Sequence, residues 1–91
     1  ALYPQNADAL QIWGISEAQK GHPEIGVTYL KQAVEITPNA AHIHNNLANL
    51  LSGLGQVDEA AIHYQTALKH NPNLSEALHN LGNIYRNQQN L

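Results

Sequence analysis

Carboxamide and imidazole side chains recur at helical spacing in the second half of the chain, and they are the residues best placed to bind a ligand. The first set lies at i, i+3, i+4 and i+7: His42, Asn45, Asn46 and Asn49. The second set keeps the same phase 34 residues later: Glu76, His79, Asn80, Asn83 and Asn87. Residues at this spacing share one helix face. Carboxamides both donate and accept hydrogen bonds, which suits them to hold the backbone of an extended peptide.

A helix face that merely meets water is also polar, so this pattern has a second interpretation. Exposed helix faces usually carry Glu, Lys and Arg, because Asn is a poorer helix former. Here Asn46 recurs as Asn80 and Asn49 recurs as Asn83. The recurrence favours a binding surface over a solvated face, and we place Arg86 at its margin.

Histidine spacing argues against a metal centre, although the chain contains six histidines. His42 and His44 are two residues apart and point to nearly opposite sides of a helix. His63 and His70 are two turns apart, about 10 Å along the axis, which is too far for one ion. A nucleophile with a spaced base, a Gly-rich phosphate loop and paired catalytic carboxylates are also missing from the sequence. The sequence therefore predicts neither a metal, nor a cofactor, nor an enzyme.

Composition limits the class of partner. The 91 residues make at most one ordinary domain, and 43% of them are hydrophobic while only 12% are charged. A net charge of −3 provides no basic footprint for nucleic acid or for an anionic membrane. There is no cysteine and no apolar run as long as a membrane span. We expect a protein or peptide partner and a cytoplasmic location.

The elements that must carry these side chains are amphipathic helices. Between residues 41 and 74, apolar residues recur at helical spacing on both sides of Gly55, and Pro72 ends the second pattern. Glycine supplies the permissive backbone that a turn between two helices requires. Applied to the whole chain, the pattern predicts five helices: Ala7–Lys20, Pro23–Ile36, Ala41–Leu54, Val57–His70 and Ser75–Gln88.

The chain repeats itself with a period of 34 residues. Pro4, Pro38 and Pro72 have this spacing, and so do Gly21 and Gly55. A fixed period with small and large residues at matched places is typical of stacked helix pairs that each contact only their neighbours.

This pattern resembles the tetratricopeptide repeat family over essentially the whole chain. The family's alternation of large, small and aromatic residues with a closing proline is met in the middle repeat by Leu47, Ala48, Leu51, Ala60, Tyr64, Ala67 and Pro72. The resemblance implies an all-α, right-handed solenoid of about two and a half repeats and five helices. Glu17, Gly26 and His44 depart from the family pattern, and we expect them to weaken local packing.

The resemblance also predicts where the repeats begin and end. Residues 1–6 match the tail of a preceding repeat, residues 7–40 and 41–74 are full repeats, and residues 75–91 hold the first helix of a third. We therefore expect the chain to be cut from a longer array. Its last helix would expose Leu78, Leu81 and Tyr85, and we expect self-association through this open C-terminal face.

In this family the inner helix of each repeat faces a concave groove, so the resemblance places the asparagines on a peptide-binding surface. Repeats that clamp a C-terminal carboxylate use cations, whereas this chain has Gln11, Ile15 and Glu76 at matching places. The stretches 46–49 and 80–83 are more similar to the arrays of O-linked N-acetylglucosamine transferases, which grip substrate backbone. Two alternatives to a binding module remain. The first alternative is a substrate-recruiting segment of a larger glycosyltransferase, and the second is a structural or self-assembly spacer.

Overall fold

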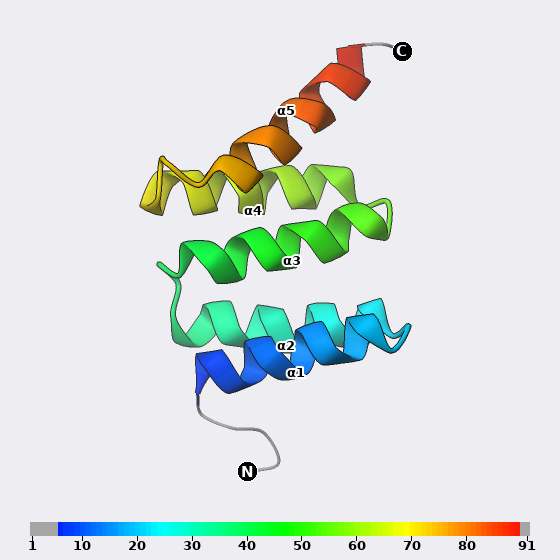
Figure 1. Cartoon of the computed structure of the whole chain (residues 1–91), viewed down its shortest axis with the longest axis vertical. Coiled ribbons are helices and arrows are strands. Elements are labelled where there is room, and N and C mark those ends of the chain that lie inside the picture. The colour runs from blue at the N-terminus through cyan, green and yellow to red at the C-terminus, as the bar shows by residue number, and fades with distance from the viewer. Residues whose placement is uncertain (1–5, 90–91) are drawn as a thin grey trace.

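The computed structural model describes residues 6–89 as five helices, and no strand occurs in that range. The helices are α1 (Ala7–Gln19), α2 (Pro23–Ile36), α3 (Ala41–Gly53), α4 (Val57–His70) and α5 (Ser75–Gln89). They stack in chain order into an elongated body of 45 × 28 × 16 Å (Figure 1). The predicted all-α architecture is confirmed, with every helix start as predicted and every end within one residue.

The two turns inside the helix pairs have the same hydrogen-bonded geometry. Gly21 and Gly55 follow α1 and α3 with φ of 93° and 81°, a region that side-chain-bearing residues rarely adopt. After α3, Gly55 N–H donates to Ser52 O at 3.0 Å and Gln56 N–H to Leu51 O at 2.9 Å. This is the Schellman arrangement, which satisfies the last carbonyls of a helix. It reverses the chain, so that each pair is antiparallel.

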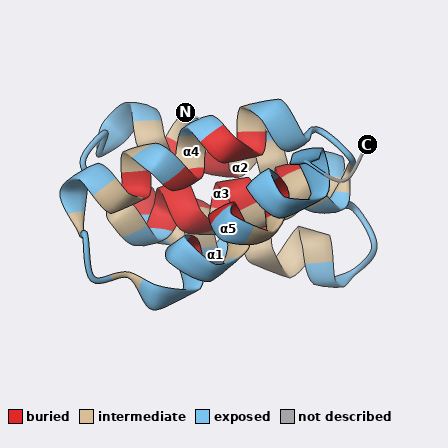
Figure 2. Ribbon diagram, turned by 90° about the horizontal axis from the view of Figure 1, so that it is seen from above, coloured by how far each residue is buried: buried red, intermediate tan, exposed pale blue. Residues whose placement is uncertain are grey.

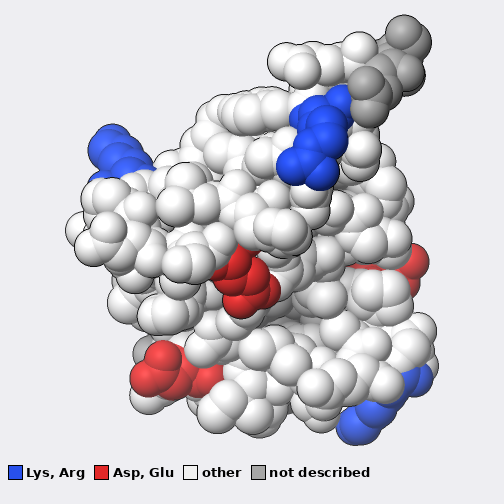
Figure 3. Space-filling model, turned by 45° about the horizontal axis from the view of Figure 1, so that its top comes forward, with Lys and Arg blue, Asp and Glu red and all other residues white. Residues whose placement is uncertain are grey.

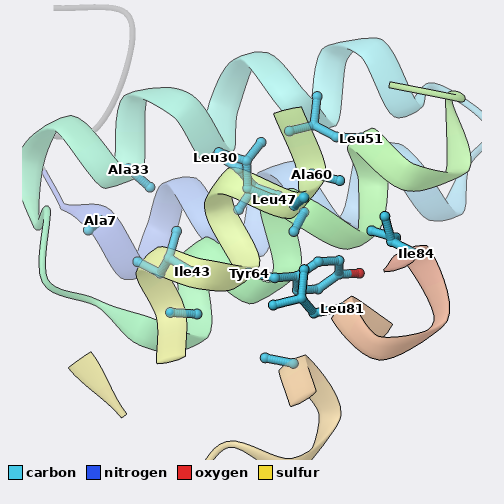
Figure 4. Packing of buried hydrophobic residues seen from close by; sticks show 14 of the residues in the cluster. Ala7, Leu30, Ala33, Ile43, Leu47, Leu51, Ala60, Tyr64, Leu81 and Ile84 are labelled. Carbon is cyan, nitrogen blue, oxygen red and sulfur yellow. The ribbon is translucent and has the colours of Figure 1, made fainter. Parts of the chain in front are cut away.

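Buried side chains form one continuous core that runs from helix to helix. Its largest fully buried members are Tyr64, Leu10, Leu30, Leu47 and Leu51. Seen from above, the buried positions line the interior between the helices, and the outward positions are exposed (Figure 2). The close-up shows the Tyr64 ring beside Leu81, among buried side chains of α3 and α5 (Figure 4). Because each helix pair shares this core with the next, the pairs are held in a stack.

Two glycines let the first helix pair approach closely. A Cβ atom on Gly26 would lie 2.6 Å from the carbonyl oxygen of Gly14, and one on Gly14 would lie 2.9 Å from that of Gly26. Backbone therefore packs on backbone where α1 meets α2. The expectation that Gly26 weakens packing is wrong, because the missing methyl group is what allows this contact.

The open side of α5 is less apolar than expected. Leu81 is buried, with 8% of its surface exposed, so its predicted exposure is wrong. Leu78 and Tyr85 are exposed at 54% and 41%. Leu81 lies on the side of α5 that packs on the core, whereas Leu78 and Tyr85 lie outside it. Residues 1–5 of the predicted tail at residues 1–6, with Pro4, lie outside the described residues, and so do residues 90–91 of the predicted third repeat.

Candidate functional site

The inner helices α1, α3 and α5 carry the predicted binding residues. Viewed from above, α2 and α4 lie along one side of the molecule and α1 and α5 along the other, with α3 between them (Figure 2). Four of the predicted residues are exposed: His42, Glu76, His79 and Asn87. Four are partly buried: Asn46, Asn49, Asn80 and Asn83. Because eight of the nine reach solvent, the structure leaves this face open to a ligand.

Asn45 is the ninth, and the structure corrects its placement. Only 2% of its surface is exposed, so it lies inside the stack and not on the open face. Its Oδ1 atom has no hydrogen-bond partner among the described residues. One residue along a helix turns a side chain by about 100°, which separates buried Asn45 from partly exposed Asn46.

The carboxamide of Asn49 joins three helices. Its Nδ2 donates to Oε1 of Glu76 at 2.9 Å, and its Oδ1 accepts from Nδ2 of Asn80 at 3.1 Å. The hydroxyl of Tyr64 donates to the same Oδ1. Asn49 therefore links α3 to α4 and α5, and most of its hydrogen-bonding capacity is used inside the protein.

The Tyr64 hydroxyl remains a donor in this network. Burial raises the pKa of Tyr64 above its ordinary value of 10.0, the hydrogen bond with Asn80 opposes that rise, and the negative charge of Glu76 adds to it. A raised pKa keeps the proton on the phenol oxygen. The hydroxyl thus continues to donate to Asn49.

A second carboxamide contact joins the first two repeats. Nδ2 of Asn46 donates to Oε1 of Gln11 at 2.9 Å and connects α3 to α1. Some of the carboxamides predicted to bind a peptide therefore also form hydrogen bonds between neighbouring inner helices. By contrast, no hydrogen bond within residues 6–89 engages the side chain of Asn83 or Asn87.

An open recess lies beside this network, with a volume of about 670 Å³. Asn80, Asn83 and Asn87 of α5 line one wall, Asn49 and Ser52 of α3 another. The apolar or aromatic residues in its lining are Val57, Tyr64 and Ile84. Apolar surface edged by amides suits a peptide, which presents both side chains and backbone polar groups.

Two smaller recesses continue along the inner helices. One, of about 590 Å³, lies where α1 and α3 begin and includes Asp8, Gln11 and His42 in its lining. The other, of about 270 Å³, includes Ile15, Asn46 and Asn49. The three recesses together border all three inner helices.

His44 and His63 form a hydrogen-bonded pair between α3 and α4. Their Nδ1 atoms are 3.1 Å apart, with ring centroids 5.3 Å apart and an interplanar angle of 24°. Because the Nδ1–Nδ1 distance is much shorter than the distance between the ring centroids, the two rings meet edge to edge through these nitrogen atoms. Nε2 of His44 lies 2.7 Å from the carbonyl oxygen of Pro38, which can only accept. In neutral His44 the Nδ1 atom is therefore an acceptor, and His63 donates to it.

Charges around His63 act in opposite directions. Burial lowers its pKa below 6.5 and nearby His44 lowers it further, while Glu59 raises it and Lys31 lowers it. Glu59 lies 3.9 Å from Nε2 of His63 and is held by Lys31 at 3.0 Å. The net result is a lowered pKa, so His63 favours the neutral form in the folded protein.

The sequence pattern alone does not predict several of these contacts. The sequence places Tyr64 in the repeat pattern and Gln11 on an inner helix, but it does not predict the hydrogen bonds that these side chains form. The His44–His63 pair is also not predicted by spacing along one helix, because its members lie on α3 and α4. The signal was available, since His44 and His63 lie on opposite sides of the Gly55 turn and an antiparallel hairpin brings such positions together.

Charge is sparse on the molecular surface. The face in Figure 3 is largely uncharged, with its acidic and basic side chains separate from one another. Within residues 6–89, no group of three or more His, Cys, Asp or Glu side chains is arranged to hold a metal ion. No helix of the described part is long and apolar enough to cross a membrane.

Comparison with protein families identifies the repeat. One profile described as tetratricopeptide repeat matches residues 41–74, and a second with the same description matches residues 63–91. The two matches together extend over more than half of the chain, and they agree with the resemblance drawn from residue spacing.

Individual relatives match part of a longer protein. The chain is 43% identical over 56 residues to the human protein O-mannosyl-transferase TMTC1 and 43% identical over 54 residues to its mouse counterpart. These matches take in 62% and 59% of this chain but only 6% of each relative. The crystal structure of MamA superposes on 93% of this chain and 50% of its own, with a TM-score of 0.91 and 19% identity. That similarity shows a shared fold.

Proposed function

Because this chain belongs to the tetratricopeptide repeat family, we propose that it is an interaction module that binds an extended segment of a partner protein along α1, α3 and α5. Tetratricopeptide repeats generally mediate contacts between proteins. The described face has features that suit such binding: open recesses lined by both apolar side chains and amides.

One observation carries the proposal. Asn83 and Asn87 line the recess of about 670 Å³, and their amides make no hydrogen bond within the described residues. Each amide can donate to and accept from a peptide backbone. Asn80 adds a free carbonyl oxygen, because its hydrogen bond to Asn49 uses only the amino group.

The predicted site residues thus have different roles. Asn83, Asn87 and the free atoms of Asn80 contact the partner in the recess that they line. His42, Glu76 and His79 are exposed and lie along the same inner helices, with Arg86 at the margin. Asn46 and Asn49 contribute less directly, since each already bonds to a neighbouring helix.

A displayed library of random linear 12-residue peptides tests this proposal. The protein should retain specific peptides, and the variant Asn83→Ala/Asn87→Ala should lose them while keeping its helical circular dichroism. The matched control Asn39→Ala/Asn73→Ala removes two exposed amides from the turns between repeats and should bind as the unchanged protein does. Equal binding by the Asn83/Asn87 variant would reject this site, and retention of no peptide would reject the function.

A second candidate is suggested by the relatives. The partial match to protein O-mannosyl-transferase TMTC1 favours a repeat segment of a larger glycosyltransferase. The name of this relative refers to mannosyl transfer, whereas the resemblance drawn from the sequence was to N-acetylglucosamine transferases. In that case the bound segment is an acceptor substrate. Reading the coding sequence on either side of these 91 residues tests it, since a catalytic domain would be recognisable there.

A structural spacer is the third candidate, and the hydrogen bonds between inner helices favour it. In that case Asn46, Asn49 and Asn80 hold the repeats together and the recesses remain empty in the library experiment. Self-association through exposed Leu78 and Tyr85 and a cytoplasmic location stay predictions.

A further inference from the structure

The carboxylate of Glu76 is oriented by a hydrogen bond but has no cationic partner among the described residues. Asn49 donates to its Oε1 at 2.9 Å, and Asn49 is itself held by Tyr64 and Asn80. Among the described residues, no Lys, Arg or His lies within ion-pair distance of Glu76, and its side chain is exposed. An oriented carboxylate needs little further ordering when it binds a cation, which reduces the entropic cost of that contact.

Glu76 belongs to a row of equivalent positions. Asp8, His42 and Glu76 are each the second residue of an inner helix and are 34 residues apart. Asp8 and His42 line the recess where α1 and α3 begin. Asp8 also has no ion pair within the described residues. The edge along which the inner helices begin is therefore acidic at both ends.

Within residues 6–89, none of the four Lys and Arg residues forms an ion pair with Asp8 or Glu76. Lys20 lies 4.0 Å from Glu17, and Lys31 lies 3.0 Å from Glu59. Lys69 is in the last turn of α4, on an outer helix. Arg86 is ten residues from Glu76 on α5, about 15 Å along the helix axis. This separation exceeds the Debye length at physiological salt, so the interaction between the two exposed charges is largely screened.

We propose that the partner segment carries a Lys or Arg side chain that pairs with Glu76, so that this face selects basic peptides and rejects acidic ones. This rests on the proposed peptide-binding function and names its partner class. Glu76 Oε1 is held by Asn49, which leaves Oε2 for a charge-assisted hydrogen bond from the incoming cation. A peptide carboxylate at the same place would meet like charge without a compensating cation.

The structural interpretation is that Glu76 only stabilises the start of α5, since acidic side chains favour helix N-termini. Glu24 provides the matched control, because it is also the second residue of its helix, is also exposed and lies on outer helix α2. Glu76→Gln and Glu24→Gln each remove one negative charge from a first helical turn. Gln at position 76 retains an oxygen that can accept from Asn49.

The experiment starts from peptides that the unchanged protein retains from the random 12-residue library. Lys or Arg should be enriched at one position, and Glu76→Gln should weaken a synthetic selected peptide about fivefold by fluorescence anisotropy, as an exposed charge pair allows. Glu24→Gln should bind normally. Replacing the enriched Arg by citrulline, or Lys by norleucine, should weaken binding similarly, and Glu76→Gln should then add no further loss.

The outcomes separate this inference from the function beneath it. Peptides that bind without basic enrichment, or equal binding by Glu76→Gln, would overturn the role of Glu76 and leave the groove function standing. Equal losses in Glu76→Gln and Glu24→Gln would also overturn it, since they would reflect net charge alone. Retention of no peptide would remove both proposals.

Discussion

Nδ2 of Asn80 donates a hydrogen bond to Oδ1 of Asn49 at 3.1 Å, and this contact joins α5 to α3 through the inner face. The two residues belong to successive repeats and were expected to act side by side on a ligand. Asn49 in fact serves first as a link between helices, because it also binds Glu76 and Tyr64. This makes the asparagines unequal in their effects on folding.

Asn49→Ala should lower the free energy of unfolding by about 1–3 kcal/mol, because it leaves the partly buried groups of Tyr64 and Asn80 without their acceptor. Urea unfolding followed by circular dichroism measures the change. Asn83→Ala is the control, since it replaces the same residue type in a helix but breaks no hydrogen bond within residues 6–89, and it should stay within about 0.5 kcal/mol. Equal losses in the two variants would contradict the linking role.

Tyr64→Phe should cost about 0.5–1.5 kcal/mol of stability, since it removes one hydrogen bond while keeping the buried ring. The same variant identifies the phenol with the raised pKa. In a spectrophotometric titration, the component that ionises above pH 10.0 should be present in the unchanged protein and missing from Tyr64→Phe. A difference spectrum that titrates at or below pH 10.0 would contradict the burial argument.

Acid should destabilise the fold through His63. Its pKa is lowered in the folded protein from 6.5, mainly by burial and by His44. Below pH 6.5 the unfolded chain binds a proton that folded His63 refuses, so the free energy of unfolding falls as pH falls. The loss should level off below the folded pKa, and the stabilisation should be complete above pH 6.5. Urea unfolding at several pH values between 4.5 and 8 gives the profile.

Two variants assign that profile to the histidine pair. His63→Gln should flatten the dependence below pH 6.5, because the residue with the lowered pKa is gone. His70→Gln removes an exposed histidine from the same helix and should leave the profile unchanged. An unchanged slope in His63→Gln would show that the acid sensitivity arises elsewhere.

Alanine substitution should have opposite effects at two glycines. At Gly26 the added methyl group would meet the Gly14 carbonyl oxygen at 2.6 Å, so overpacking should cost about 1–3 kcal/mol. At Gly82 an added methyl group meets nothing within 4 Å, so Gly82→Ala should stabilise α5 by about 0.5–1 kcal/mol. Thermal unfolding of the two variants compares them directly, and a stabilised Gly26→Ala would contradict the close α1–α2 contact.

The sequence alone determined the helices, their turns and the family. Leu47 and Leu51 recur at the period of a helix, and Gly55 and Pro72 act on the backbone conformation of their own neighbourhood. These signals are local, because they depend on residues within one or two turns. The 34-residue period then required stacked pairs, since one pair cannot bury both of its apolar stripes.

Only the tertiary structure decided what each polar side chain does. It buried Asn45, left Asn83 free, joined Asn49 to Glu76 and paired His44 with His63. Each of these outcomes depends on how neighbouring helices cross and on their relative rotation, where about 100° per residue separates a buried side chain from an exposed one. The sequence pattern gives the repeated asparagines no distinguishing feature. The packing of one helix against the next engages some of them in hydrogen bonds between helices and leaves others available to a partner.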